Sequence, residues 1–170
     1  YGMTEAGMIT SNPLTGERRA GTVGFPLADI SARVCSDKGR ELKNGEIGIL
    51  EIKGPNVFRG YWKLPQKTRE EFREDGFFIN GDLAVQDERG YISIVGRDRD
   101  MVISGGLNVY PKEIEERLNL TDWVVESAVF GLPHDDLGEA VTAVVVWETD
   151  RECDERALLA KLRRHPVSYT

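Results

Sequence analysis

Four residues carry side chains suited to binding phosphate, a divalent cation or sugar hydroxyls. Thr4 and Glu5 are adjacent, so a hydroxyl that can bond a phosphate oxygen stands beside a carboxylate that can hold Mg²⁺. Asp82 begins an expected strand, where a carboxylate can accept two hydrogen bonds from a ribose diol. A solvated aspartate at a strand end is the plainer interpretation. Arg97 offers a planar fork of donors to ribose or phosphate oxygens.

Residues 96–115 combine a flexible segment, a rigid segment and a segment whose backbone is accessible. They include the charged run Arg97-Asp98-Arg99-Asp100. An ion pair inside this run is a second interpretation of Arg97. Gly105 and Gly106 have no Cβ, so their backbone can approach a ligand or another chain closely. Pro111 has the φ angle preferred at the first position of a helix. A hairpin leading into a surface helix fits this pattern equally well.

Residues 96–115 resemble the hinge-and-lid block of the adenylate-forming family, which comprises acyl-CoA synthetases, luciferases and the adenylation domains of peptide synthetases. Two further blocks that resemble this family lie upstream in the expected order, Tyr-Gly-Met-Thr-Glu at residues 1–5 and Asn-Gly-Asp at residues 80–82. The resemblance covers nearly the whole chain. The segments that look most like malonyl-CoA synthetases are residues 8–13, 53–60 and 105–115.

The resemblance implies a nucleotide site formed by the first block. Tyr1 is expected to lie against the adenine, and Gly2 and Met3 to contact the acyl group or the nucleotide. Thr4 is expected to bond the α-phosphate of ATP, and Glu5 to hold Mg²⁺. ATP or AMP and Mg²⁺ are therefore implied ligands.

Two residues further along the chain complete this site in the family. By resemblance, Asp82 binds the ribose diol. Arg97 binds ribose or phosphate oxygens and counts among the catalytic residues.

The resemblance also implies a moving lid that admits coenzyme A. Gly105 and Gly106 are expected to let the pantetheine arm of CoA run past the backbone, where a side chain would obstruct it. Asn108 is expected to orient groups during thioester formation, although a turn-stabilising role is the alternative. The hinge is expected at Asp98 and Arg99. The family most often has Asp or Lys at the hinge position that Arg99 occupies.

The pattern of expected elements predicts a mixed α/β and α+β fold in two domains. Residues 1–98 contain many short strands at close spacing, which favours a small barrel or sandwich. By resemblance they form the end of a large nucleotide-binding domain, including its distorted β-barrel. Residues 99–170 alternate strands with helices expected near 111–118 and 154–164, and resemble a truncated α+β lid.

Several parts of the family pattern are expected outside these residues. The phosphate-binding loop and most of the acyl pocket precede residue 1 in the family, and an invariant lysine follows the lid. The segment at residues 165–170 does not match the family's continuation, which suggests a truncation or a shifted reading frame.

Composition limits the possible partners and compartments. The net charge of −7 argues against a nucleic-acid-binding surface, which needs a basic patch. The two cysteines, Cys35 and Cys153, are too few for a disulfide framework and lack metal-ligand spacing. The longest apolar run, at 140–147, is far shorter than the ~20 residues of a membrane span. A cytoplasmic protein without an identifiable protein partner is expected.

The resemblance implies an acid-thiol ligase that forms AMP. A carboxylic acid and MgATP would give an acyl-adenylate, and CoA would then displace AMP. Malonate or a similar short acid is the expected substrate. Two alternatives remain: an adenylation domain that loads a carrier protein, and a remnant without catalysis that binds nucleotide or partners.

Overall fold

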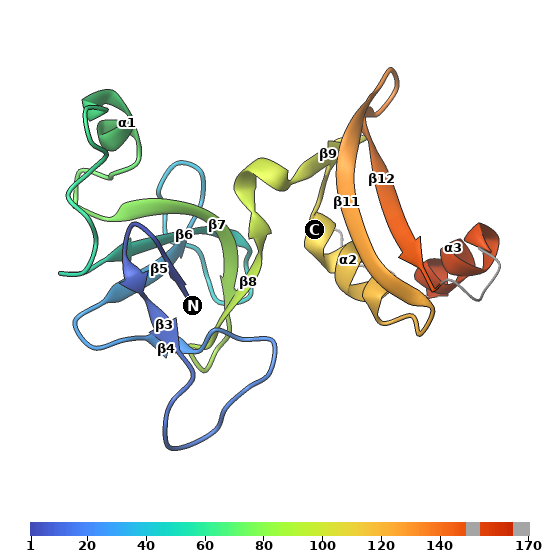
Figure 1. Cartoon of the computed structure of the whole chain (residues 1–170). Coiled ribbons are helices and arrows are strands. Elements are labelled where there is room, and N and C mark those ends of the chain that lie inside the picture. Colours follow the sequence, from blue (N-terminus) through green and yellow to red (C-terminus); the bar gives the residue numbers. More distant parts are fainter. Residues whose placement is uncertain (149–153, 165–170) are drawn as a thin grey trace. The chain divides into compact units, whose positions relative to one another are not determined.

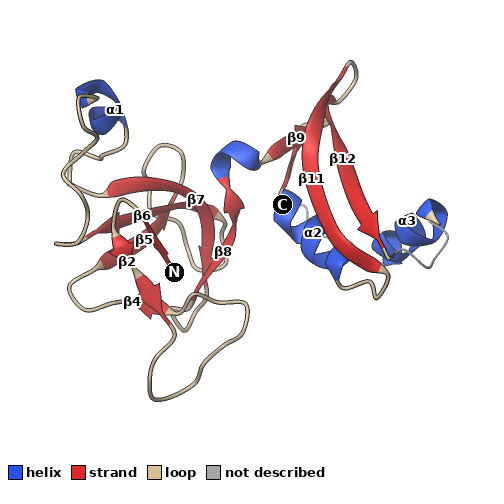
Figure 2. Cartoon of the chain, in the orientation of Figure 1, coloured by secondary structure: helices blue, strands red, loops and turns tan. Residues whose placement is uncertain are grey.

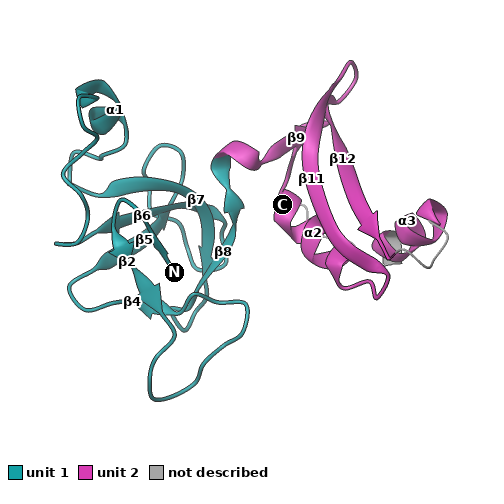
Figure 3. Ribbon diagram, in the orientation of Figure 1, with its two compact units in different colours: residues 1–98 teal, residues 99–170 magenta. Residues whose placement is uncertain are grey.

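The chain forms two compact units, and the computed structural model describes residues 1–148 and 154–164 (Figure 1). Unit 1 is Tyr1–Asp98 and unit 2 is Arg99–Thr170 (Figure 3). Each unit has a hydrophobic core of its own. Cys153 and the segment at 165–170 lie outside the described residues.

Unit 1 is built mainly from antiparallel strands (Figure 2). Its main sheet has the order β5-β6-β7-β8, formed by Ser31–Cys35, Gly48–Lys53, Phe78–Gln86 and Ile92–Arg97. Two small sheets pair β1 with β2 and β3 with β4, formed by Gly2–Met3, Gly7–Met8, Thr10–Ser11 and Phe25–Pro26. The helix α1, Pro65–Glu70, lies between β6 and β7 in the sequence.

The main sheet is open, which corrects the distorted β-barrel expected from the resemblance. A closed barrel needs hydrogen bonds between its first and last strands. Within residues 1–98, which are all described, β5 pairs with no strand other than β6 and gains only an isolated bridge between Cys35 and Glu41. The other edge strand, β8, gains only an isolated bridge between Ile92 and Gly24. The prediction of strands is therefore confirmed, whereas the prediction of a barrel is wrong.

The core of unit 1 lies against the main sheet. β6 is buried on both faces, because Leu50, Glu51 and Ile52 are all fully buried. Apolar side chains from strands and from the first hairpin region complete the core, namely Ala6, Ile9, Val34, Phe78, Ala84 and Ile92. The sequence pattern did not reveal that a carboxylate lies among them.

The buried carboxylate of Glu51 is matched by two arginines. Arg33 donates to its Oε2 from Nε at 2.9 Å and from Nη2 at 2.8 Å, and Arg73 donates to its Oε1 from Nε at 2.7 Å. Arg33 also bonds Asp75 at 2.7 Å and lies 3.8 Å from the ring centroid of Phe77. This network ties the segment that follows α1 to β5 and β6, directly before β7 begins.

Unit 2 contains a sheet in the order β10-β9-β12-β11, with a helix after β10 and another after β12 (Figure 1). Its strands and helices are β9 Val102–Ser104, β10 Leu107–Val109, α2 Pro111–Asn119, β11 Val124–His134, β12 Gly138–Trp147 and α3 Glu155–Arg164. A 3₁₀ turn, η1 at Asp98–Asp100, joins β8 to β9 along the chain.

The two helices of unit 2, which were expected near 111–118 and 154–164, each bury one apolar face. Helix α2 begins with Pro111 at its first turn, as expected, and buries Ile114 and Leu118. Leu158 of α3 is buried and Leu162 packs against the same core. No helix within residues 1–148 and 154–164 is both long enough and apolar enough to cross a membrane.

Removing the Glu51 carboxylate should destabilise unit 1. In Glu51→Ala, Arg33 and Arg73 lose their shared buried partner, although their side chains are 19% and 25% exposed and regain some water. We expect a loss of roughly 2 to 4 kcal/mol. Glu88→Ala, at an exposed turn residue, is the control and should have little effect. Thermal melting of the full-length protein checks this, and equal melting of both variants would contradict the role assigned to Glu51.

Candidate functional site

Tyr1, Asp82 and Arg97, which the sequence predicted to share a site, lie together in unit 1. The Tyr1 hydroxyl donates to Oδ2 of Asp82, and Nε of Arg97 lies 3.4 Å from Oδ1 of the same carboxylate. Arg97 is the residue directly opposite Asp82 in the β7–β8 ladder. Arg97 therefore pairs with Asp82 rather than with Asp98 or Asp100, the partners considered from the sequence.

A bulge in β7 presents Asp82 to Tyr1. On β6 only Leu50 separates Ile49 from Glu51, but their partners on β7, Leu83 and Ile79, enclose the three residues 80–82. Gly81 has a φ of +77°, a conformation that glycine adopts without strain. The bulge thus requires a glycine at its centre.

Asn80 holds the bulge and was not assigned a role from the sequence. Its Oδ1 accepts a hydrogen bond from the Asp82 amide at 2.9 Å, which closes an Asx turn. Its Nδ2 donates to the Tyr1 hydroxyl at 3.0 Å. The only available signal was its place in the Asn-Gly-Asp block, which is a common turn sequence.

The electrostatics of this cluster keep the phenol of Tyr1 protonated. Burial raises the pKa of Tyr1, and the hydrogen bond to Asp82 raises it further. Asp82 is only 8% exposed, whereas the Arg97 side chain is 71% exposed. Oδ2 of Asp82 is thus held by Tyr1, whereas Oδ1 has a longer contact with an exposed arginine.

The first block forms a tight hairpin in which Thr4 and Glu5 lie at the tip. Gly2 pairs with Met8 and Met3 with Gly7, and a Cβ on Gly2 would overlap the carbonyl oxygen of Gly7. Met3 packs against the core of unit 1.

At the hairpin tip, Thr4 is exposed and Glu5 is half-buried. The carbonyl oxygen of Glu5 accepts from the Phe58 amide at 2.8 Å, and its carboxylate lies 3.3 Å from the Tyr61 hydroxyl. Sequence reasoning missed Tyr61.

A single carboxylate at Glu5 suits Mg²⁺ that is shared with substrate phosphates. Such ions keep several waters and bind through one or two carboxylates together with phosphate oxygens. Within residues 1–148 and 154–164, no cluster of three or more His, Cys, Asp or Glu side chains forms a complete protein cage for a metal. Glu5 fits the shared arrangement, with the adjacent Thr4 hydroxyl available to a phosphate.

The predicted lid residues lie in unit 2. Gly105 and Gly106 form the two-residue turn between β9 and β10, with φ angles of +58° and +82°. Two positive φ values in a row characterise a type I′ hairpin turn. Asn108 follows on β10, opposite Ile103, and is half-buried. The predicted hinge residues Asp98 and Arg99 are exposed in η1.

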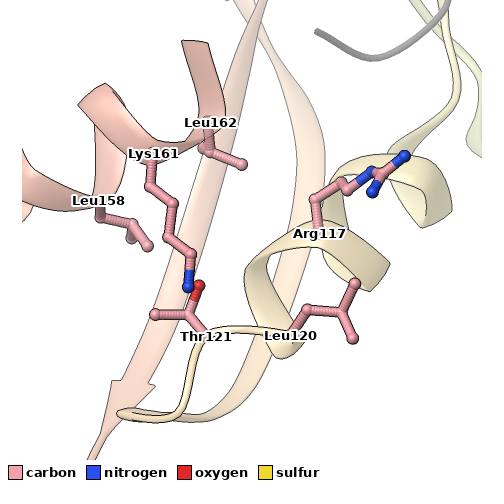
Figure 4. A pocket seen from close by; sticks show the side chains of 6 residues that line it. All are labelled: Arg117, Leu120, Thr121, Leu158, Lys161 and Leu162. Atoms are coloured by element: carbon pink, nitrogen blue, oxygen red, sulfur yellow. The ribbon is translucent and has the colours of Figure 1, made fainter. Parts of the chain in front are cut away.

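A separate pocket of about 170 Å³ lies between α2 and α3 (Figure 4). It is lined by Arg117, Leu120, Thr121, Leu158, Lys161 and Leu162. None of the predicted site residues lines it. The pocket is therefore distinct from the Tyr1–Asp82–Arg97 cluster.

Family models match most of the chain in two segments. The model described as AMP-binding enzyme matches residues 1–62, and the one described as AMP-binding enzyme C-terminal domain matches residues 113–169. The long-chain-fatty-acid–CoA ligase of Yersinia pestis is 39% identical over 99% of this chain and 30% of its own length. The malonate–CoA ligase of Arabidopsis thaliana is 45% identical over 88% of this chain and 24% of its own length.

Solved structures match the chain as well. ATP-bound MatB from Rhodopseudomonas palustris is 55% identical, with a TM-score of 0.94 over 99% of this chain and 34% of MatB. The apo form of the same protein gives a TM-score of 0.73 over 98% of this chain. The chain thus spans a third or less of the length of the curated relatives it matches.

Asp82→Asn should lower the pKa of Tyr1 toward its usual value, because the negative charge that opposes phenolate formation is removed. Near-ultraviolet absorbance during an alkaline titration should show one extra tyrosine ionising earlier. Asp87→Asn is the control, since Asp87 accepts from backbone amides and Arg19 rather than from a phenol.

Because the pKa of Tyr1 is raised in the folded protein, the stability of the protein should fall at alkaline pH. The contribution of Tyr1 is complete below the ordinary tyrosine pKa of about 10 and is lost as the pH rises above it. The alkaline loss of stability should be smaller in Asp82→Asn. Identical titration curves for the parent and Asp82→Asn would contradict the Tyr1–Asp82 contact.

Proposed function

The chain belongs to the AMP-binding enzyme family, and from that membership we propose that it is part of an AMP-forming acyl-CoA ligase. The enzyme would join a carboxylic acid to ATP, forming an acyl-adenylate and pyrophosphate, and CoA would then displace AMP. Unit 1 would be the end of the nucleotide-binding domain, and unit 2 the C-terminal lid. The observation that carries the proposal is the Tyr1–Asn80–Asp82–Arg97 cluster, which forms a ready receptor for a nucleoside.

In the proposed nucleotide complex, Asp82 accepts hydrogen bonds from the ribose hydroxyls. The Asn80 turn and the Tyr1 hydroxyl hold its carboxylate before the nucleotide arrives. Tyr1 lies beside the adenine, and the exposed Arg97 moves from Asp82 to a ribose or phosphate oxygen. Gly2 and Met3 contribute the adjoining hairpin strand, whose close backbone approach fixes the Tyr1 position.

Adenylation would be assisted from the tip of the first hairpin. Thr4 donates its hydroxyl to the α-phosphate, and Glu5 directs a carboxylate to Mg²⁺ beside it. When bound there, Mg²⁺ neutralises charge that develops as pyrophosphate leaves. Glu5 is suited to this role because its backbone is fixed by Phe58 while its side chain remains half-exposed.

Thioester formation would depend on unit 2. The Gly105–Gly106 turn has no Cβ atoms to obstruct the pantetheine arm of CoA, and a Cβ at Gly106 would project into open space. Asn108, on the following strand, would orient the reacting groups.

Rotation about Asp98 and Arg99 would bring unit 2 into place for the second step. The ATP-bound and apo structures of MatB match the chain with TM-scores of 0.94 and 0.73, so the part of MatB that the chain matches differs in conformation between them.

A short acid with a second anionic group is the proposed substrate class. Relatives named malonate–CoA ligase and sulfoacetate–CoA ligase are 45% and 40% identical to the chain, and both named acids are of this kind. The long-chain-fatty-acid–CoA ligases at 39% identity favour a second candidate, a fatty acid. Malonate is preferred because the malonate–CoA ligase has a higher identity over its matched part, 45%, than the fatty-acid ligase, 39%.

Single substitutions should impair one half-reaction and leave the other largely unchanged. The assays use an enzyme of full family length, either the protein that carries this chain or MatB with these residues in place of its matched third. Glu5→Gln should lower ATP–pyrophosphate exchange by roughly two to three powers of ten, because it removes a charge used only as pyrophosphate leaves. Thioester formation from supplied acyl-adenylate should change much less.

Gly106→Leu should spare exchange and block thioester formation, because its side chain would occupy the path of CoA. Gly45→Leu is a matched control, since Gly45 also has a positive φ, +87°, and nothing near its Cβ position. Arg99→Pro should resemble Gly106→Leu, because proline fixes φ at the hinge. Equal loss of both half-reactions in Gly106→Leu and Arg99→Pro would reject the lid assignment.

Substrate preference can be measured in the same enzyme. We expect faster AMP release with malonate than with methylmalonate, acetate or octanoate, because the acyl pocket is proposed to hold a second carboxylate. A higher kcat/KM with octanoate would instead support the fatty-acid candidate.

A further inference from the structure

The hydroxyl of Tyr61 lies between two carboxylates. Its oxygen is 2.9 Å from Oε2 of Glu71 and 3.3 Å from Oε1 of Glu5. A phenol has one proton, so it can donate to only one of these carboxylates at a time. The shorter contact is the one to Glu71.

The Tyr61 ring is held firmly by its neighbours in the sequence. Its backbone amide donates to Oγ1 of Thr68 at 2.9 Å, and its ring meets Phe58 edge-on at 4.8 Å between centroids. Nζ of Lys67 lies 4.2 Å from the ring centroid and 3.8 Å from Oε1 of Glu71. The hydroxyl is therefore a fixed point rather than a mobile surface group.

The segment from Phe58 to Tyr61 contacts Glu5 in two places. The Phe58 amide donates to the Glu5 carbonyl oxygen at 2.8 Å, and the Tyr61 hydroxyl reaches the Glu5 carboxylate. Glu5 lies at a hairpin tip beside the exposed Thr4. The tyrosine thus limits the positions that the carboxylate can take at an otherwise open turn.

We propose that Tyr61 is a positioning residue for Glu5 and that Glu71 is the second acceptor of its proton. The inference rests on the proposed function, in which Glu5 holds the divalent cation. Without a cation, the hydroxyl can donate to Glu5 and keep its carboxylate in place. When a cation satisfies Glu5, the hydroxyl donates to Glu71, so Glu5 is released without leaving the phenol unpaired.

The physical advantage lies in the alternative acceptor. If Tyr61 had only Glu5 as an acceptor, a cation that took the Oε1 lone pair facing the hydroxyl would leave the phenol proton without an acceptor, and the cation would bind more weakly. If Glu5 had no partner, its carboxylate would lose rotamer freedom on binding the cation. Partners that orient a metal ligand in this way typically change metal affinity by roughly 10- to 100-fold.

Tyr61→Phe in the enzyme of full family length tests the proposal. Mn²⁺, which is visible by electron paramagnetic resonance, replaces Mg²⁺ as the probe, and a non-hydrolysable ATP analogue is present. We expect Mn²⁺ affinity to fall roughly tenfold. The Mg²⁺ concentration that half-saturates exchange should rise by a similar factor, while thioester formation from supplied acyl-adenylate stays unchanged.

Tyr91→Phe is the matched control in the same unit. It also removes one phenol oxygen, whose partner is the Glu17 carbonyl at 2.7 Å, and Tyr91 is only 4% exposed. It should leave Mn²⁺ affinity unchanged. Unchanged Mn²⁺ affinity in Tyr61→Phe, or an equal fall in both half-reactions, would overturn the proposal and leave Tyr61 a purely structural role.

Glu5→Gln, measured in parallel, separates the two proposals. If Glu5→Gln weakens Mn²⁺ binding and Tyr61→Phe does not, only the positioning role fails. If neither variant affects Mn²⁺ binding, the cation role of Glu5 fails as well. Should Tyr61→Phe not fold, Lys67→Met keeps the hydroxyl but removes the ammonium group over the ring and its ion pair with Glu71. It should weaken Mn²⁺ binding roughly two- to fivefold, and no change there would overturn the proposal.

Discussion

A carboxylate taken out of water must have its charge matched, and in unit 1 this requirement falls on Glu51. Two arginines from different parts of the chain meet it, one from β5 and one from the segment after α1. That segment carries Glu71 at its start and leads into β7, where the Asn80–Asp82 bulge lies. The same ion network therefore supports both the proposed nucleoside receptor and the second acceptor of the Tyr61 proton.

The sequence predicted local structure well because local structure depends on near neighbours. The short strands of residues 1–98 were expected, and Pro111 marked the start of α2. The burial of Glu51 was not predictable in this way. Its partners lie 18 and 22 residues away, and nothing in the pattern of β6 distinguishes a buried carboxylate from an exposed one. The open edge of the main sheet is likewise a property of pairing between distant strands.

The site was found through blocks of residues rather than through periodicity. Tyr1, Asp82 and Arg97 were chosen by resemblance, and the structure brings these three together in one cluster. Tyr61 and Glu71 were missed because neither residue type signals a role by itself, and their meeting with Glu5 depends on how α1 packs. The sequence suggested an ion pair of Arg97 within the charged run at 97–100. In the structure Arg97 pairs with Asp82 instead, because Asp82 is the acidic residue opposite it in the β7–β8 ladder.

The bulge at residues 80–82 also has a consequence for how this chain can change length during evolution. Between the positions that pair on either side of the bulge, β7 has two more residues than β6. Because two is an even number, the side chains before and after the bulge still point to the same faces of the sheet as in a regular strand. Deleting one residue there would turn the side chains beyond it to the opposite face of the sheet. Deleting two would restore a regular ladder and remove the Asx turn. The bulge is therefore constrained in length as well as in sequence, since Gly81 has a positive φ and the Asn80 side chain closes the turn.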